Sequence, residues 1–87
     1  MKVILGRQFR KSYKKLQDGE KRKFALRRNL FLESPLDPRL NSHILHGDYS
    51  GYRSINITGD LRVIYKPLGD NLALFIDIGT HHELYGK

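Results

Sequence analysis

Four histidines supply the side chains that can exchange a proton near neutral pH, and they stand in two pairs. His43 and His46 precede the main run of predicted strands, and His81 and His82 follow the last strand. An imidazole titrates close to physiological pH, so each ring can act as a general acid or a general base. The residues alone leave a second interpretation open, because a histidine in a small basic domain is commonly solvated or structural.

Cationic and acidic side chains accompany the histidines. Asp60 and Arg62 lie on or beside a predicted β-hairpin, Arg53 lies on the strand before it, and Tyr85 ends the terminal segment. Guanidinium groups suit phosphate oxygens. If the sheet forms as its pattern predicts, Asp60, Arg62 and His81 lie close together near one sheet edge. Each also has a structural interpretation, as a turn residue, a solvated arginine or an anchor for the C-terminus.

The same histidines could bind a metal, but the set of ligands is incomplete. Zinc sites gather three or four convergent ligands with supporting hydrogen bonds. The spacing His43-x-x-His46 and the pair His81-His82 come without a cysteine or a plausible glutamate partner. We therefore expect no metal site and no cofactor. The absence of cysteine also excludes a disulfide scaffold and a cysteine nucleophile.

The positive charge of the chain is concentrated in its N-terminal third. The net charge is +7, yet residues 1–28 hold eleven basic and two acidic residues, and residues 29–87 hold five basic and seven acidic residues. A basic segment of this density predicts a polyanionic partner, either a nucleic acid or an acidic protein. We interpret five cations of this segment as candidate phosphate-binding residues: Lys11, Lys14, Lys15, Arg22 and Arg27.

Length and hydropathy limit the class of protein. The 87 residues predict one domain, residues 1–87. No apolar run approaches the ~18 residues of a membrane span, and the first five residues are too short for a signal sequence. The absence of cysteine is compatible with a reducing compartment. We expect a cytoplasmic protein without a membrane partner.

The N-terminal pattern predicts a strand followed by two helices. Residues 2–5 form a short apolar run, and apolar side chains then recur at helical spacing over residues 7–17. Asp18-Gly19 is a turn signal in which Asp18 can cap a second helix over residues 19–33. Pro35 and Pro38 end that helix. Two basic helices joined by a short turn predict an αα-hairpin.

The remainder of the chain has the pattern of a β-sheet. Strands are expected at residues 44–45, 52–57, 61–66 and 72–78, with the last buried on both faces, and residues 80–85 are expected to form about one helical turn. Between the second and third of these strands, Thr58-Gly59-Asp60 predicts a tight hairpin turn. The fold class is therefore α+β in the order β-α-α-β-β-β. The helical hairpin packs on one face of a twisted, mostly antiparallel sheet.

Four segments in this order resemble the RelE/ParE superfamily of toxins from bacterial type II toxin–antitoxin systems. They are Ser42–Gly47, Gly51–Arg53, Gly59–Lys66 and Ile78–Tyr85, which ends in Gly-Thr-His-x-x-Leu-Tyr. The similarity is closest to the YafQ-like mRNA interferase branch. The expected helical hairpin and first strand fit the same RelE-like, microbial-ribonuclease-like fold.

The resemblance implies a metal-independent endoribonuclease that enters the ribosomal A site and cuts mRNA. A base takes the proton of the ribose 2′-OH, which attacks the adjacent phosphate, and an acid protonates the departing 5′-oxygen. By position in the family motifs, His81 is the expected acid and His43 or Asp60 the expected base. Arg62 is expected to bind the scissile phosphate with Arg53 as a second cation. Tyr85 is expected to stack on a base or to orient the substrate.

Three positions depart from the YafQ-like pattern. Asn56 stands where the family has a histidine, Leu61 where it has an aromatic residue, and Asp77 near a basic residue of the family. The departures keep two alternatives open, a ParE-like inhibitor of DNA gyrase and a catalytically weak RNA-binding toxin homologue. Under each hypothesis we expect an acidic antitoxin as protein partner. The nuclease hypothesis adds ribosomal RNA and mRNA as partners.

Overall fold

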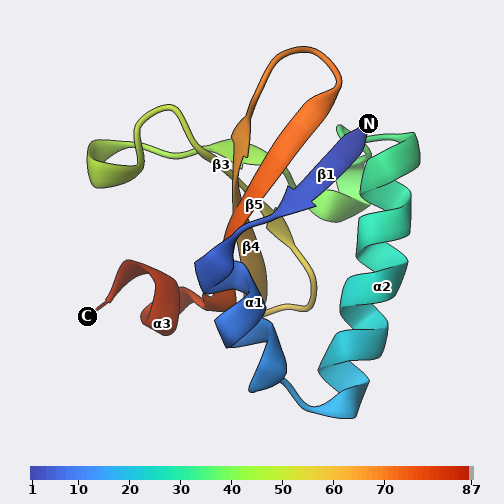
Figure 1. Ribbon diagram of the computed structural model, residues 1–87, viewed down its shortest axis with the longest axis vertical. Helices are drawn as coiled ribbons and strands as arrows, with labels where there is room; N and C mark the ends of the chain where they lie inside the picture. The colour runs from blue at the N-terminus through green and yellow to red at the C-terminus, as the bar shows by residue number, and fades with distance from the viewer. Residues whose placement is uncertain (87) are drawn as a thin grey trace.

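A five-stranded mixed sheet forms the centre of the molecule (Figure 1). The computed structural model describes residues 1–86. The strands lie in the order β1-β5-β4-β3-β2, with β1 parallel to β5 and every other neighbouring pair antiparallel. Their bounds are β1 Lys2–Leu5, β2 His43–Ile44, β3 Arg53–Asn56, β4 Leu61–Pro67 and β5 Leu72–Thr80. The predicted α+β class and the mostly antiparallel sheet are confirmed.

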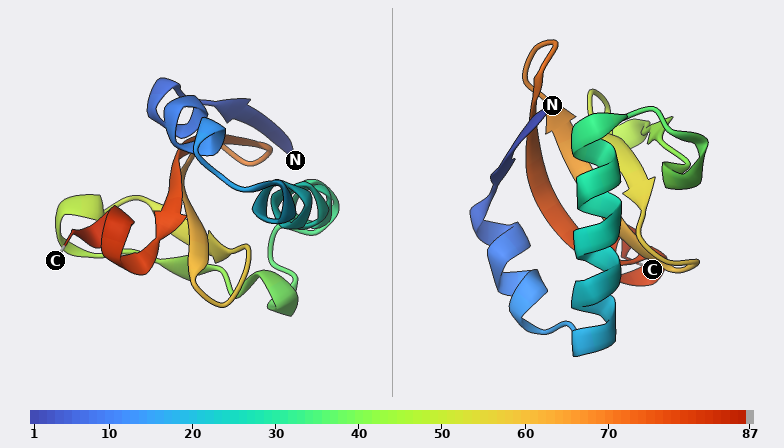
Figure 2. Two further views of the ribbon diagram at one scale, coloured as in Figure 1. Left: turned by 90° about the horizontal axis from the view of Figure 1, so that it is seen from below. Right: turned by 90° about the vertical axis from the view of Figure 1, so that its right-hand side faces the viewer.

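Two helices cover one face of the sheet and form the predicted helical hairpin (Figure 2). Helix α1 spans Arg7–Lys14 and α2 spans Asp18–Glu33. The first helix is shorter than the predicted range 7–17, because Gln17 is already extended and serves as the N-cap of α2. The backbone N–H of Gln17 donates to Glu20 Oε1 at 2.9 Å, completing a reciprocal capping box. The expectation that Asp18 caps α2 is therefore wrong, since Asp18 is the first residue inside the helix.

Aromatic rings fill the space between the helical hairpin and the sheet. Phe31 lies 5.0 Å from Tyr65 and 5.5 Å from Phe75 between ring centroids, and Phe9 lies 5.3 Å from Phe24. All five rings are at most 3% exposed. Their strand members stand on one face of β4 and β5, so the alternation of the strands selects the side on which the helices pack.

The opposite face of the sheet carries a second, smaller core. Ile64 lies between Val63 and Tyr65 in β4, so its side chain points away from the helical hairpin. It packs with Leu45 and with Leu84 of α3, the short helix His81–Tyr85. Two 3₁₀ turns, η1 at Pro38–Leu40 and η2 at Gly47–Tyr49, shape the segments before and after β2. This second face is where the candidate site residues gather.

Among the helices of residues 1–86, none combines the length and apolar character needed to cross a membrane.

Candidate active site

The register of the sheet brings Arg62 and Asn56 together on the face opposite the helical hairpin. Arg62 of β4 stands directly across from Asn56 of β3 on one side and Gly79 of β5 on the other. Leu61 pairs with Thr80, so Asp60 and His81 are next in register where β4 begins and β5 ends. The pairing therefore places the positions of Asp60, Arg62 and His81 near the end of two interior strands rather than at a sheet edge.

The paired Asn56 and Arg62 side chains each contain an unsatisfied polar atom. Asn56 Oδ1 and Arg62 Nε are shielded from solvent and have no hydrogen-bond partner within the described residues. Such atoms are rare in folded proteins, because each costs ~1–3 kcal/mol in lost hydration. One is an acceptor and the other a donor, and because neither atom touches solvent, a bound hydroxyl or phosphate group would reach them only after the side chains move.

Helix α3 holds His81 and Tyr85 in contact. Their ring centroids are 4.6 Å apart, and Tyr85 in turn packs edge-on against Tyr49 at 5.8 Å. The helix is anchored at its start, where Thr80 Oγ1 accepts from the Glu83 N–H at 3.1 Å and Glu83 Oε1 accepts from the Thr80 N–H at 2.8 Å. His81 is exposed and Tyr85 is half-buried. The aromatic contact thus orients an imidazole whose surface remains accessible.

His43 uses both ring nitrogens inside the protein. Nδ1 lies 3.0 Å from the Asn41 carbonyl oxygen, and Nε2 lies 3.0 Å from Ser54 Oγ. A carbonyl can only accept, so Nδ1 carries a proton, and in the neutral ring Nε2 accepts from the Ser54 hydroxyl. Ser54 is fully buried. His43 can take a proton from a substrate only after its bond to Ser54 breaks. Sequence reasoning did not single out Ser54, although its alternation with Asn56 placed both on one face.

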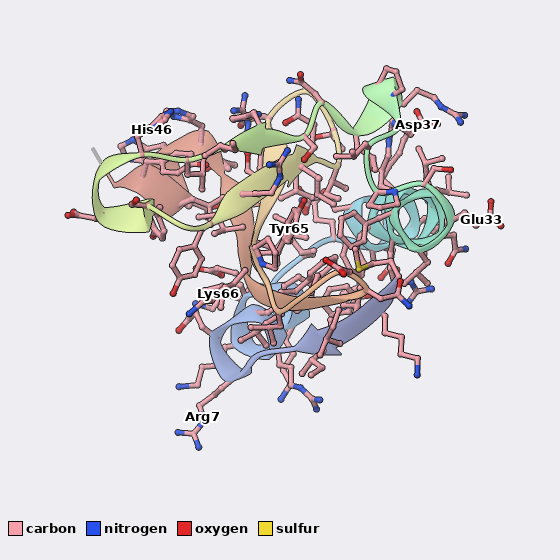
Figure 3. All side chains as sticks on the ribbon, turned by 90° about the horizontal axis from the view of Figure 1, so that it is seen from above. Arg7, Glu33, Asp37, His46, Tyr65 and Lys66 are labelled. Carbon is pink, nitrogen blue, oxygen red and sulfur yellow. The ribbon has the colours of Figure 1, made fainter. Side chains whose placement is uncertain are left out.

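Arg53 lies away from this group. It pairs with Tyr65 across the strands and so faces the helical hairpin, where its guanidinium donates to Ser42 Oγ at 3.2 and 3.3 Å. The structure does not bring Arg53 to the phosphate site expected around Arg62, because residues 53 and 56 of one strand point to opposite faces. Figure 3 shows His46 on the loop after β2, far from Tyr65 in the interior.

Comparisons with known proteins concern the whole chain and its fold. The family model for the bacterial toxin YafQ of type II toxin–antitoxin systems matches residues 1–86. The mRNA interferase toxin YafQ of Escherichia coli K12 is 34% identical over 73 residues, which are 84% of this chain and 78% of that protein.

The chain belongs to the YafQ toxin family.

Solved structures of YafQ share the fold. The crystal structure of YafQ from E. coli BL21(DE3) has a TM-score of 0.82 at 30% identity and covers 97% of both chains. YafQ in the E. coli DinJ–YafQ complex has a TM-score of 0.69 at 31% identity, again over 97% of both chains. The YoeB/ParE toxin of Agrobacterium tumefaciens, at 21% identity and a TM-score of 0.75 over 93% of this chain and 99% of its own, shares the fold.

Two of the residues that depart from the YafQ-like pattern, Leu61 and Asp77, make structural contacts. Leu61 is 2% exposed in the main core and so offers no surface for a nucleotide base. The Asp77 carboxylate accepts from Ser12 Oγ at 2.6 Å and from the Ile78 N–H at 2.8 Å. It therefore joins β5 to α1 instead of serving a substrate.

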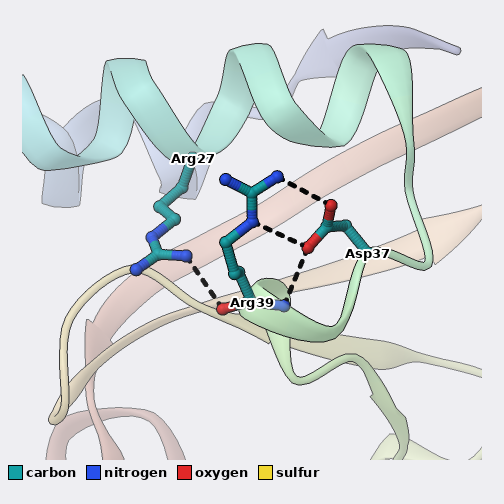
Figure 4. A network of polar contacts seen from close by, with 3 residues as sticks. All are labelled: Arg27, Asp37 and Arg39. Carbon is teal, nitrogen blue, oxygen red and sulfur yellow. Dashed lines mark hydrogen bonds and ion pairs between the residues drawn. The ribbon is translucent and has the colours of Figure 1, made fainter.

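The predicted phosphate-binding cations of this YafQ-family chain lie on the helical hairpin. Four of them are exposed, Lys11, Lys14, Lys15 and Arg22. Arg27 is half-buried and donates from Nη1 to the Arg39 carbonyl oxygen at 2.9 Å (Figure 4). Within residues 1–86, no group of three or more His, Cys, Asp or Glu side chains is placed to hold a metal ion.

Proposed function

We propose that this chain is an endoribonuclease toxin that cuts mRNA on the ribosome by attack of a ribose 2′-OH on the adjacent phosphate, without a metal. The observation that carries the proposal is the paired Asn56 Oδ1 and Arg62 Nε, both shielded and unpartnered, beside His81. The name of the E. coli relative, an mRNA interferase, supports the same reaction. Such a toxin acts in the cytoplasm.

The residue roles follow from charge and accessibility. Arg62 would bind the phosphate and stabilise the charge that develops on its oxygens. His81, accessible and oriented by Tyr85, would protonate the departing 5′-oxygen. We prefer Asp60 as base, because it is exposed and next in register to His81, whereas His43 must first leave Ser54. His43 remains the alternative base.

The protein partner proposed here is an acidic antitoxin. Two crystal structures contain E. coli YafQ in complex with DinJ, and one of them describes the pair as a toxin–antitoxin complex. The helical hairpin of this chain offers ten basic residues. A small acidic protein that lays an amphipathic helix on this surface would neutralise it, with an affinity that falls as salt rises.

The first prediction concerns the roles of His81 and Arg62 in mRNA cleavage. We expect wild-type chain to arrest growth and to produce cleaved mRNA ends that primer extension maps. His81→Gln and Arg62→Gln should each lower the cleavage rate ~10²–10⁴-fold, because each removes acid–base or electrostatic help. His82→Gln is the matched control, since His82 is an exposed histidine on the same helix.

Full cleavage by His81→Gln and Arg62→Gln would refute the assigned site. Intact mRNA together with inhibited DNA gyrase would replace the proposed reaction with the ParE-like one. Intact mRNA and normal growth at high expression would identify a homologue without catalysis. The buried Leu61 and the bonded Asp77 are the features that favour this last outcome.

A further inference from the structure

A basic cavity opens at the outer edge of β3. β2 pairs only with Arg53 and Ser54, so beyond Ser54 no strand covers the outer side of β3 within residues 1–86. The cavity there has a volume of about 380 Å³ and lies between α2, η1 and the turn that leads to β4. Its lining residues are Lys23, Arg27, Arg39 and residues 56–59.

Asp37 neutralises the charge of only one of the three cations that line the cavity, Arg39. Asp37 accepts from Arg39 Nη2 at 2.9 Å, from its Nε at 3.0 Å and from its backbone N–H at 2.9 Å (Figure 4). These hydrogen bonds to Arg39 lower the pKa of Asp37 from 3.8 to about 2, so the pair is ionised at neutral pH. It is the only ion pair among the described residues. Lys23 and Arg27 therefore keep an uncompensated positive charge at the cavity.

Arg27 is held in place at the cavity wall. Its Nη1 donates to the Arg39 carbonyl oxygen at 2.9 Å, which ties α2 to η1. This bond uses one of the five guanidinium N–H groups, and the others remain free to donate. Lys23 stands one helical turn earlier on the same face of α2 and is exposed. Arg27 is therefore held in position, and Lys23 adds a second positive charge on the same face of α2.

Asn56 links the cavity to the candidate active site along the sheet. This residue lines the cavity and also stands directly across from Arg62 in the β3–β4 pairing. Neighbouring strands are ~4.8 Å apart, so the cavity begins one strand away from the proposed scissile phosphate. A single RNA strand that crosses Arg62 and Asn56 would leave the sheet at this edge.

We propose that the cavity binds one backbone phosphate of the mRNA strand that flanks the cleavage site, with Lys23 and Arg27 as its ligands. Arg39 and Asp37 form the frame that positions Arg27. The proposal rests on the proposed ribonuclease function and adds a second contact to the same substrate. It also gives β3 a reason to lack an outer neighbour beyond Ser54, because a strand there would close the path.

The test replaces phosphates of the mRNA one at a time. Programmed ribosomes carry mRNAs in which a single uncharged methylphosphonate replaces one phosphate near the mapped cleavage position, and single-turnover cleavage is followed. With wild-type chain we expect one flanking replacement to slow cleavage about tenfold, the size of one lost charge-assisted hydrogen bond. The variant Lys23→Gln/Arg27→Gln should be about tenfold slow on unmodified mRNA and lose nothing more on that replacement.

Controls separate the cavity from the fold and from the reaction. Lys2→Gln removes an exposed lysine at the opposite edge of the sheet and should behave as wild type. If Arg27→Gln unfolds the chain, Lys23→Gln alone serves as the test variant. It breaks no hydrogen bond to the protein and should show the same phosphate dependence. The inference is overturned if both variants cleave at the wild-type rate, or if their cleavage slows equally whichever phosphate is replaced. Either outcome leaves the proposed ribonuclease function standing. Failure of wild-type chain to cleave any mRNA overturns both.

Discussion

At the scale of single residues, the two candidate bases, His43 and Asp60, differ in the hydrogen bonds they must break before they accept a proton. Both ring nitrogens of His43 are bonded, to the Asn41 carbonyl and to Ser54. The Asp60 side chain is exposed in the turn before β4. Proton abstraction by His43 therefore carries the cost of breaking a bond to a buried hydroxyl, ~0.5–1.5 kcal/mol. Asp60 carries no such cost.

The second prediction follows from this difference. Asp60→Asn should lower the mRNA cleavage rate ~10²–10⁴-fold, because an amide cannot take a proton. His43→Gln should lower it less than about tenfold, the share expected of one lost hydrogen bond near the site. Single-turnover cleavage on programmed ribosomes measures both. If His43→Gln is the more damaging change, His43 is the base and its bond to Ser54 is a resting state.

Residue types were easier to predict than the directions in which side chains point. His81, Asp60 and Arg62 could be selected from motif order, and the register then placed them at one end of β4 and β5. Arg53 shows the limit. The strand period of two places Arg53 on the same side as Ile55 and opposite Asn56, but similarity to the family motif assigned it to the site. The structure follows the alternation, since the strand period of two determines which face a side chain occupies.

At the scale of elements, the first turn of α3, which carries His81, packs closely over Gly79 of β5. A Cβ at Gly79 would lie 3.1 Å from Glu83 Oε1 and 3.3 Å from Glu83 Cβ. Glu83 is also the residue that caps α3 by accepting from the Thr80 N–H. A side chain at position 79 would therefore press on the residue that caps α3.

The third prediction tests this contact. Gly79→Ala should lower the free energy of unfolding by ~1–3 kcal/mol through overpacking, and it should also slow cleavage because α3 carries His81. Gly59→Ala is the matched control, since nothing lies within 4 Å of its Cβ position and it should stay within ~0.5 kcal/mol of wild type. Denaturant unfolding measures both. A stable Gly79→Ala with full activity would mean that α3 adjusts freely.

The bounds of elements were predictable to within a few residues, and the misplacements have identifiable causes. The cap of α2 was assigned to Asp18 because aspartate is a frequent N-cap. The reciprocal bonds between Gln17 and Glu20 moved the cap one residue earlier and shortened the linker after α1. The parallel pairing of β1 with β5 joins segments some 70 residues apart. No local pattern contains that information, because it depends on how the helical hairpin returns the chain to the sheet.

At the scale of the whole molecule, basic charge and candidate chemistry occupy opposite faces of one sheet. The helical hairpin on one face holds ten of the sixteen basic residues, while Arg62, Asn56 and His81 stand on the other. Contacts to phosphate position a protein on nucleic acid without reading its sequence. A molecule with principal extents of 31 × 28 × 24 Å can thus dock through one face and act through the other.

The final prediction separates docking from chemistry. Lys11→Gln/Lys14→Gln/Lys15→Gln should weaken association with ribosomes and flatten its dependence on salt, because each phosphate contact contributes a slope of ~0.7–0.9 in log affinity against log salt. Once the ribosome is saturated, the cleavage rate should equal that of wild type, since no residue beside Arg62 has changed. All three lysines are exposed, so the unfolding midpoint should also be retained. A lower rate at saturation, with unchanged association, would place these lysines in the chemical step and join the two faces into one site.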